Sequence, residues 1–431
     1  MGKYITIGMG ASRAKDSKKA AIDAASAAAK QCGGKPSFSI VFVNDAADPQ
    51  AVLAGVNGVL GTNWIGVSAD KQFSTEHGYS PDTQVSVLSL ATSYMHFGVA
   101  VVDDYRNDPR KAGERAAREA IGACKADKYV DSYIQFTRAK KKDYGAIIRT
   151  PPYFMLAFLS GAKIRKSGVV PGNESEFVAG MLTYTGPHVP MFGGSASSSF
   201  EEYFKGKADN FQFANGKLYR DAAIAVFVIS DLQFHTHVLH GYDTTKQFAA
   251  VTKLSTSGYD ILELNGKEPV AEIARLLGMS KAAYLKDIEQ LAMKRPFGLV
   301  QADGTAYVKE ALPNADKKTL HSTFKLYPNS ILNILAFDKT KTLHTLRDSL
   351  KDALEIDKRA ALGLFCVCSG RRPLIKGIES KELREVKAAR INIPVFGFYS
   401  YSEVGSTATT SPQSHSQTIT SLVLYDALLS D

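Results

Sequence analysis

The feature of this sequence that most restricts its fold is an order of elements that occurs three times. Each copy has a short apolar strand, a helical segment, a second apolar strand ending in small and polar residues, a polar loop and a third apolar strand. Three copies of such a unit indicate a mixed α/β protein with internal duplication. Alternating strands and helices also occur in α/β proteins without duplication, so the repeat is a prediction to be compared with the fold.

The corresponding elements follow the same order in every copy. In the first copy the helix is predicted to start at Asp48 and Pro49, because Asp caps free N–H groups and Pro suits the first helical position. The other two helices are predicted to cover residues 174–179 and 380–388. The opening strands are predicted at residues 39–43, 153–159 and 362–368, the second strands at 64–70, 190–196 and 393–399, and the third strands at 85–90, 223–229 and 418–424.

The first two copies also share a continuation. Its apolar and aromatic residues have equal spacing, which supports the repeat. These residues are Phe97, Val101 and Tyr105 after the first copy, and Phe234, Val238 and Tyr242 after the second.

The segment after the second copy has a different pattern. Residues 260–266 predict a strand that ends in an Asn-Gly turn, residues 268–277 a helix closed by Gly278, and residues 281–294 a second helix. We therefore expect a domain boundary near residue 250. The predicted fold is mixed α/β, with repeated strand–helix–strand–strand units forming large sheets covered by helices, in two domains. The domains are residues 1–250, with units at about 36–120 and 151–250, and residues 251–431.

The composition is that of an ordinary globular protein. Hydrophobic residues make up 45% of the chain and charged residues 22%. The chain has 52 Lys and Arg against 43 Asp and Glu, a net charge of +9 that would suit an anionic partner. The longest basic cluster, residues 138–142, is short and has no aromatic neighbours. We therefore expect a solvated basic surface and no nucleic-acid binding.

The cysteine content and the apolar runs indicate a cytoplasmic protein. The four cysteines form no C-x-x-C pair and are too sparse for a disulfide framework. The N-terminus lacks a signal-peptide pattern, and no apolar run reaches the length of a membrane span, about 18 residues. No nucleotide-binding motif is complete, since the G-M-G-A-S at residues 8–12 lacks the rest of a phosphate loop, and we expect no cofactor.

Five segments together resemble the FIST family along nearly the whole chain. Their order and spacing carry the resemblance, since each alone is weak. They are V-T-K at residues 251–253 with D-I-L-E-L-N-G at 260–266, M-F-G-G-S-A at 191–196, C-S-G-R-R at 368–372, F-G-F-Y-S-Y-S-E-V-G at 396–405, and H-S-Q-T at 415–418. The resemblance implies an intracellular sensory protein with N-terminal and C-terminal FIST regions that binds small ligands such as amino acids. The two regions fill the chain, so we expect no output domain and a separate signalling partner.

The glycines of the second copy are candidate ligand contacts. Gly193, Gly194 and Ser195 follow a strand, where glycine lets a ligand approach backbone N–H groups. The alternative is a tight structural loop. Ser68 and Ser400 have comparable places in the other copies.

The C-terminal segments supply charged candidates. Arg371 and Arg372 follow a strand end, and a guanidinium group can bind a ligand carboxylate with two hydrogen bonds. Glu403 could bind a ligand amine, so the two charges together would suit a zwitterion; alternatively, Arg371 and Glu403 pair with each other. The predicted ligand site is completed by Cys368, Tyr399 and His415.

Two further groups suggest chemistry less strongly. Cys366 and Cys368 point to one side of a strand, but a catalytic cysteine needs a nearby base, and free cysteines are more often core residues. The H-x-H-x-x-H pattern of His235, His237 and His240 lacks a carboxylate or cysteine to complete a metal site. We therefore expect a sensor with no catalytic and no metal-binding residues. The alternatives are a self-assembling structural protein, for which a homo-oligomer would be a sign, and a Cys-dependent enzyme.

Overall fold

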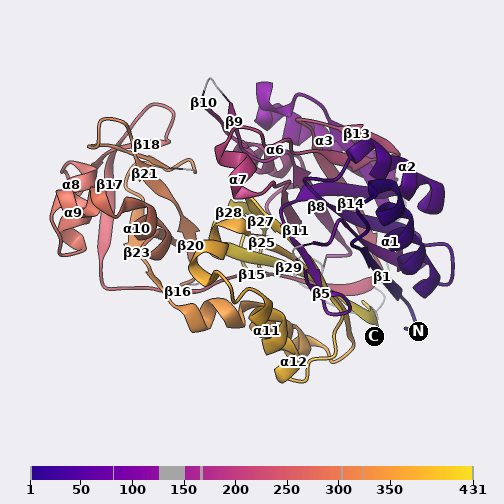
Figure 1. Ribbon diagram of the computed structural model, residues 1–431. Coiled ribbons are helices and arrows are strands. Elements are labelled where there is room, and N and C mark those ends of the chain that lie inside the picture. Colours follow the sequence, from indigo (N-terminus) through magenta and orange to yellow (C-terminus); the bar gives the residue numbers. More distant parts are fainter. Residues whose placement is uncertain are drawn as a thin grey trace.

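The protein is built from three six-stranded sheets around a common core, together with a separate lobe, in the part of the chain that the computed structural model describes (Figure 1). The described residues are 2–80, 82–125, 151–165, 168–301, 304–322 and 324–429. The basic cluster at residues 138–142 lies outside them.

The first sheet contains the first predicted unit. Its strand order is β1-β6-β2-β3-β12-β13, with α1 (Ser17–Gln31) and α2 (Pro49–Leu60) packed together beside it. The strands are β1 (Thr6–Ser12), β2 (Phe38–Asn44), β3 (Trp64–Ala69), β6 (Val85–Ala91), β12 (Gln212–Ala214) and β13 (Lys217–Tyr219).

The second sheet contains the second unit. Its order is β28-β27-β11-β8-β14-β7, and α3 (Pro109–Cys124) and α6 (Glu174–Thr185) pack together as α1 and α2 do. The strands are β7 (Met95–Val102), β8 (Tyr153–Leu159), β11 (Met191–Ser195), β14 (Ala223–Ser230), β27 (Glu403–Gly405) and β28 (Gln413–His415).

The third sheet contains the third unit. Its order is β15-β29-β25-β26-β4-β5, with α11 (Lys339–Ile356) packed against α12 (Ser380–Ala388). The strands are β15 (Leu232–His240), β25 (Ala360–Cys368), β26 (Val395–Ser400), β29 (Thr418–Leu428), β4 (Gln72–Ser74) and β5 (Gly78–Tyr79).

The three sheets share one pattern of strand pairing. In each sheet the opening and second strands pair in parallel and the third strand runs antiparallel beside the opening one. The shared continuation belongs to the start of the next unit, because Phe97 lies on β7 and Phe234 on β15, which take equivalent outer places in the second and third sheets. An origin of the units by duplication stays a prediction.

The apolar faces of the three sheets form one core. Phe42 of β2 stacks on Phe398 of β26 with ring centroids 4.3 Å apart, and Phe154 and Leu364 from the other strands join the same cluster. A cavity of about 20 Å³ remains between the sheets, and its lining is apolar. Burying aromatic side chains at this centre stabilises all three sheets at once.

A lobe, residues 248–334, is inserted between β15 and α11 and stands at the left of Figure 1. The Asn-Gly turn is confirmed, since Asn265 and Gly266 have φ of 52° and 70°. The predicted helix over residues 281–294 is wrong in one respect, because it breaks at Asp287 into α9 and α10. The lobe contains β17 (Phe248–Leu254), β18 (Asp260–Leu264), α8 (Pro269–Leu276), α9 (Lys281–Lys286), α10 (Ile288–Lys294), β19 (Phe297–Val300), β20 (Ala306–Lys309), β21 (Ala311–Pro313), β22 (Leu320–Ser322) and β23 (Ile331–Ile334).

The lobe joins the body through a small ribbon, β16 (Tyr242–Asp243) with β24 (Ala336–Phe337). Residue 250 lies inside β17, and the domain boundary near it stays a prediction.

The two ends of the described chain lie side by side (Figure 1). The Asp426 carboxylate, on β29, accepts hydrogen bonds from the backbone N–H groups of Lys3, Tyr4 and Ile5 at 2.6, 2.6 and 3.1 Å. The first residues are therefore tied to the last strand.

Candidate functional site

The predicted site residues fall into two groups at the ends of neighbouring strands. Gly194, Glu403 and His415 lie directly opposite one another, since β27 pairs with β11 on one side and β28 on the other. Cys368, at the end of β25, interacts with Glu403. We call Cys368, Glu403 and His415 the Glu403 site. The arginines and Tyr399 lie in a different set of contacts.

Glu403 is a fully buried carboxyl group without an ion-pair partner among the described residues. Its Oε1 atom accepts from Ser400 Oγ at 2.9 Å and its Oε2 atom from Thr418 Oγ1 at 3.1 Å. Burial raises the pKa of Glu403 to about 8, although these hydrogen bonds act to lower it. Glu403 is therefore largely protonated at neutral pH until a cation approaches.

His415 offers an unused hydrogen-bond acceptor. Its Nε2 atom lies 3.1 Å from the carbonyl oxygen of Gly405, so Nε2 carries the proton and donates it. Nδ1 then bears a lone pair, and this buried atom has no hydrogen-bond partner in the described chain. Burial and the charge of Lys309 lower the pKa of His415 to about 3, which keeps the ring neutral.

The two cysteines are buried thiols. Burial and the nearby Glu403 raise the pKa of Cys368 and of Cys366 well above the usual value. Both thiols are protonated, and a protonated thiol is a poor nucleophile. None of the four cysteines forms a disulfide.

The glycines allow close packing of the strand ends. A Cβ atom on Gly194 would collide with Cys366 Sγ, and one on Gly193 with the carbonyl oxygen of Ala157. Ser195 is buried, and its hydroxyl donates to Glu174 Oε1 at 2.5 Å. Gly193 thus allows β11 to lie close to β8, and Gly194 allows it to approach β25 beside Glu403.

The strand registers place the serines of the three units differently from the sequence comparison. Gly66 and Gly193 are each paired with a residue of the opening strand of their unit. Ser68 comes two residues after Gly66, and Ser195 comes two residues after Gly193. In the third sheet this glycine is Gly397, so Tyr399 takes the equivalent place and Ser400 is one residue further on.

Arg371 has a partner other than the one considered from the sequence. Its Nη2 atom donates to Glu382 Oε1 at 2.8 Å and to the backbone oxygen of Thr342 at 2.8 Å. The hydroxyl of Tyr399 donates to the second oxygen of Glu382 at 3.2 Å. The suggested Arg371–Glu403 pair is absent from the described residues because α12 brings Glu382 to the guanidinium group first. The Nε and Nη1 atoms of Arg371 are buried and have no hydrogen-bond partner there.

Arg372 joins the first and third sheets. It forms an ion pair with Asp70, which follows β3, and its guanidinium group lies 5.7 Å from the ring centre of Tyr399.

Sequence reasoning missed the lobe's contribution to the Glu403 site. Tyr307 of β20 packs edge-on against His415, with ring centroids 4.6 Å apart. Lys309 is buried, and its ammonium group lies 3.8 Å from the ring centre of Phe324. Burial lowers the pKa of Lys309 to about 7. Glu310 accepts from Gln417 Nε2 at 2.6 Å. The only sequence signal for this contribution of the lobe is the presence of charged residues in the otherwise apolar segment 306–310.

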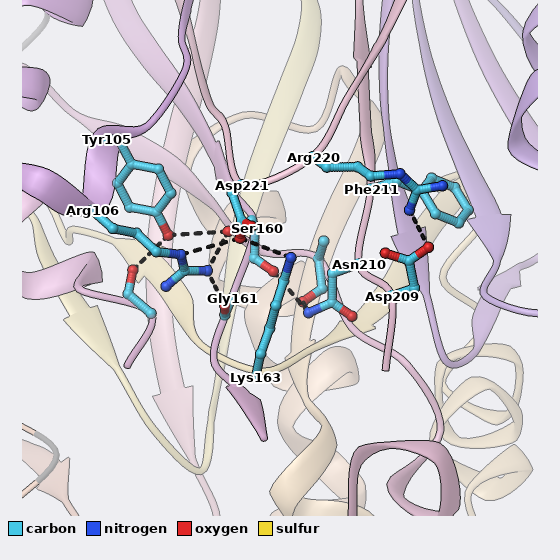
Figure 2. Close-up of polar contacts among 12 residues, drawn as sticks. Tyr105, Arg106, Ser160, Gly161, Lys163, Asp209, Asn210, Phe211, Arg220 and Asp221 are labelled. Carbon is cyan, nitrogen blue, oxygen red and sulfur yellow. Dashed lines mark hydrogen bonds and ion pairs between the residues drawn. The ribbon is translucent and has the colours of Figure 1, made fainter. Parts of the chain in front are cut away.

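A second polar cluster that sequence reasoning missed lies at the carboxyl end of β8 (Figure 2). Arg106 and Lys163 both point toward Asp221, with Ser160 beside them. We call Arg106, Ser160, Lys163 and Asp221 the Asp221 cluster. Its residues come from separate segments, so no local motif indicates it.

The histidines of β15 pack against α11. His235 and His237 have ring centroids 5.5 Å apart, and His237 lies 3.4 Å from Asp352 of α11. Burial lowers the pKa of His235 to about 4.

Two models of known protein families match this chain. The FIST N domain model matches residues 37–267, and the FIST C domain model matches residues 270–406. The chain belongs to the FIST family. FIST domains are in general sensory domains that bind small ligands. The resemblance inferred from the sequence motifs is confirmed.

The FIST protein also resembles individual proteins. It is 26% identical over 198 residues to the uncharacterized protein MJ1623 of Methanocaldococcus jannaschii. The matched region spans 43% of this chain and only 36% of the relative's own length. The crystal structure of cyanuric acid hydrolase from A. caulinodans aligns over 98% of this chain and 99% of its own, with 8% identity and a TM-score of 0.35. A score this low carries no argument about this FIST protein.

No helix in the described part of the FIST protein is long and apolar enough to cross a membrane.

Proposed function

We propose that this FIST protein is a sensor of a small zwitterion such as an amino acid, bound at the Glu403 site. The observation that carries the proposal is a pair of buried acceptors without cations. Glu403 is a buried carboxyl group with no ion-pair partner, and His415 Nδ1 is a buried lone pair with no donor in the described chain. A ligand ammonium group would supply hydrogen bonds to both acceptors.

The ligand carboxylate needs a cation close to the Glu403 site. Lys309 is buried against the ring of Phe324, and its charge acts on His415. Arg371 has two buried nitrogens without partners. We propose these two as the carboxylate-binding side chains, with Arg372 and Tyr399 holding Arg371 in position. Gly193, Gly194 and Ser195 form the edge of the site.

The place of the site supports a sensing role. It lies where β28 of the second sheet meets β20 of the lobe, so a bound ligand would change how the lobe contacts the body. We propose that a separate partner protein detects this change in the cytoplasm, where the four free cysteines would stay reduced.

Calorimetric titration with the twenty amino acids tests the proposal. We expect heat with at least one of them, and at pH 7 we expect Glu403 to release a proton on binding. The reason is that a ligand cation favours the ionised form of Glu403, whose pKa lies near 8 without a cation. Lys309, whose pKa is about 7, takes up part of a proton if it binds the ligand carboxylate. Titration in two buffers with different ionisation enthalpies measures the net proton release.

Matched variants separate the site from the rest of the protein. Glu403→Gln should weaken binding about tenfold or more and abolish the proton release, because the amide cannot ionise. The control variant is Glu201→Gln, because the Glu201 side chain is 73% exposed. This variant should bind the amino acid as wild type does. Arg371→Ala and Lys309→Met show which cation binds the carboxylate. No heat with any amino acid, and no zwitterion in the small molecules that copurify, would remove the proposal.

Two other functions predict different results. A self-assembling structural protein would appear as large polymers in native mass spectrometry, whereas a sensor would appear as a ligand-bound monomer or small oligomer. The Ala-rich α1, which could serve as an assembly helix, packs against β1 and α2 of its own chain. A Cys-dependent enzyme requires an ionisable thiol, and the raised pKa of Cys368 argues against it.

A further inference from the structure

The Asp221 cluster is separate from the Glu403 site and has the features of a built binding site (Figure 2). Arg106 comes from a single-turn helix after β7, η1 (Tyr105–Asn107), and Lys163 from the short strand β9 (Lys163–Arg165). Ser160 follows β8 directly, and Asp221 lies on the turn before β14. The carboxyl ends of parallel strands, such as β8 and β11, are where α/β proteins commonly bind ligands.

Two cations converge on one carboxylate oxygen. Lys163 Nζ lies 2.7 Å and Arg106 Nε 3.2 Å from Asp221 Oδ1. The Lys163 side chain is only 2% exposed and that of Arg106 13%, whereas the Asp221 side chain is 42% exposed. The cations are therefore fixed inside the protein, and the carboxylate reaches them from the solvent side.

The position of Arg106 does not depend on Asp221. Its guanidinium group also donates to Ser160 Oγ, to the backbone oxygen of Pro171 and, at 2.5 Å, to that of Gly161. Asn210 Nδ2 in turn donates to the backbone oxygen of Ser160 at 2.7 Å. If Asp221 moved away, Arg106 would stay in place, aimed at the position of the lost carboxylate.

The turn around Arg106 has a backbone that few sequences allow. Gly161 has φ of 73°, and a Cβ atom there would lie 2.5 Å from the backbone oxygen of Ala196. Glycine is therefore required where the chain passes the guanidinium group. Asp221 also has a positive φ, 57°, which is uncommon outside glycine.

We propose that Arg106 and Lys163 bind the carboxylate of a small organic acid, and that Asp221 occupies this site as a built-in substitute when the acid is absent. The incoming carboxylate would form the charge-assisted hydrogen bonds that Asp221 forms now. Asp221 would then move into the solvent, to which its side chain is already partly exposed.

Chemical rescue by a free carboxylate tests this proposal. The thermal unfolding of wild type and Asp221→Ala is measured at pH 7 in sodium chloride and in sodium acetate of equal ionic strength. We expect Asp221→Ala to be destabilised in chloride and to regain a few degrees of Tm in acetate, a larger rise than in wild type. Adding Lys163→Met to Asp221→Ala should abolish this rise.

A neighbouring ion pair supplies the matched control. Asp209 pairs with Arg220 nearby, and its side chain is 56% exposed (Figure 2). Asp209→Ala should show only the general effect of acetate on stability. If Asp221→Ala does not fold in chloride, Asp221→Asn keeps the side-chain volume and takes its place.

Two outcomes overturn the proposal. An acetate effect on Asp221→Ala no larger than that on Asp209→Ala means that the cations do not bind a free carboxylate. A rise in phosphate that exceeds the rise in acetate assigns the site to a phosphate group instead. Neither result affects the Glu403 site, which amino acid calorimetry and Glu403→Gln test separately.

Discussion

Glu403 and His415 are neutral at physiological pH for the same physical reason. Burial disfavours the charged form of each, which raises the pKa of the acid to about 8 and lowers that of the base to about 3. The two groups are opposite each other on β27 and β28. An uncharged carboxyl group and an uncharged imidazole can stay buried without a ligand. When a cation binds, Glu403 ionises, and both groups can accept hydrogen bonds from the cation.

The buried carboxyl group makes stability depend on pH. Because the pKa of Glu403 is about 8 when folded and near its usual 4.5 when unfolded, the folded state holds the proton more tightly. Its contribution to stability is present below about pH 4.5 and is lost as the pH rises to about 8. Glu403→Gln should therefore lose less stability than wild type between pH 5 and pH 9, by on the order of a few kcal/mol. Urea unfolding at several pH values measures this difference, and equal pH dependence in both proteins would contradict it.

The partner of Arg371 shows what sequence reasoning could not supply. Both Glu382 and Glu403 follow the arginine within a short distance along the chain, and both become buried. Only the packing of α12 against α11 decides that Glu382 meets the guanidinium group. The candidate residues could thus be named from motifs, but their pairing follows from tertiary packing.

At the scale of elements, local patterns predicted the strands and helices of the repeated unit. The helix over residues 380–388 is α12 with the same ends, and the strand over residues 153–159 is β8. The exchange of strands between units was not predictable. β12 lies between the second and third strands of the second unit yet pairs with β3 of the first sheet. β27 lies at the corresponding place in the third unit yet pairs with β11 of the second sheet. Pairing over such separations depends on packing rather than on local propensity.

The aromatic stack on β2 links two sheets and should dominate their stability. Phe42 is fully buried and stacks on Phe396 and Phe398 of β26, with centroids 5.0 and 4.3 Å away. Phe42→Ala should cost about 3–5 kcal/mol of unfolding free energy, because it leaves a cavity between the first and third sheets. Phe248→Ala, whose side chain is 48% exposed, is the control. A similar small loss for both variants in denaturant unfolding would show that the stack is not a major stabilising contact.

At the scale of the whole molecule, the lobe is an insertion that contacts the body at the Glu403 site. The units on either side of it could be recognised by their periodicity, whereas the position of the lobe could not, because its contacts involve single residues such as Tyr307.

Removing the Tyr307 ring should loosen the lobe selectively. Tyr307→Ala deletes the ring that packs on His415, so amides of β19 and β20 should exchange hydrogen faster while those of β2 and β8 stay protected. Tyr327→Ala, with a side chain 67% exposed on the lobe, should leave both regions unchanged. Hydrogen exchange followed by mass spectrometry separates the two regions, and a uniform increase across all sheets would contradict a local contact.

The clamp between Asp426 and the backbone of residues 3–5 has a consequence for engineering. Since the two ends are held at one place, a short linker could join them, and new ends could be opened at an exposed loop of the lobe. Such a circular permutant would keep all three sheets while its new ends report directly on the lobe. A fluorescent protein inserted there would turn movement of the lobe into an optical signal.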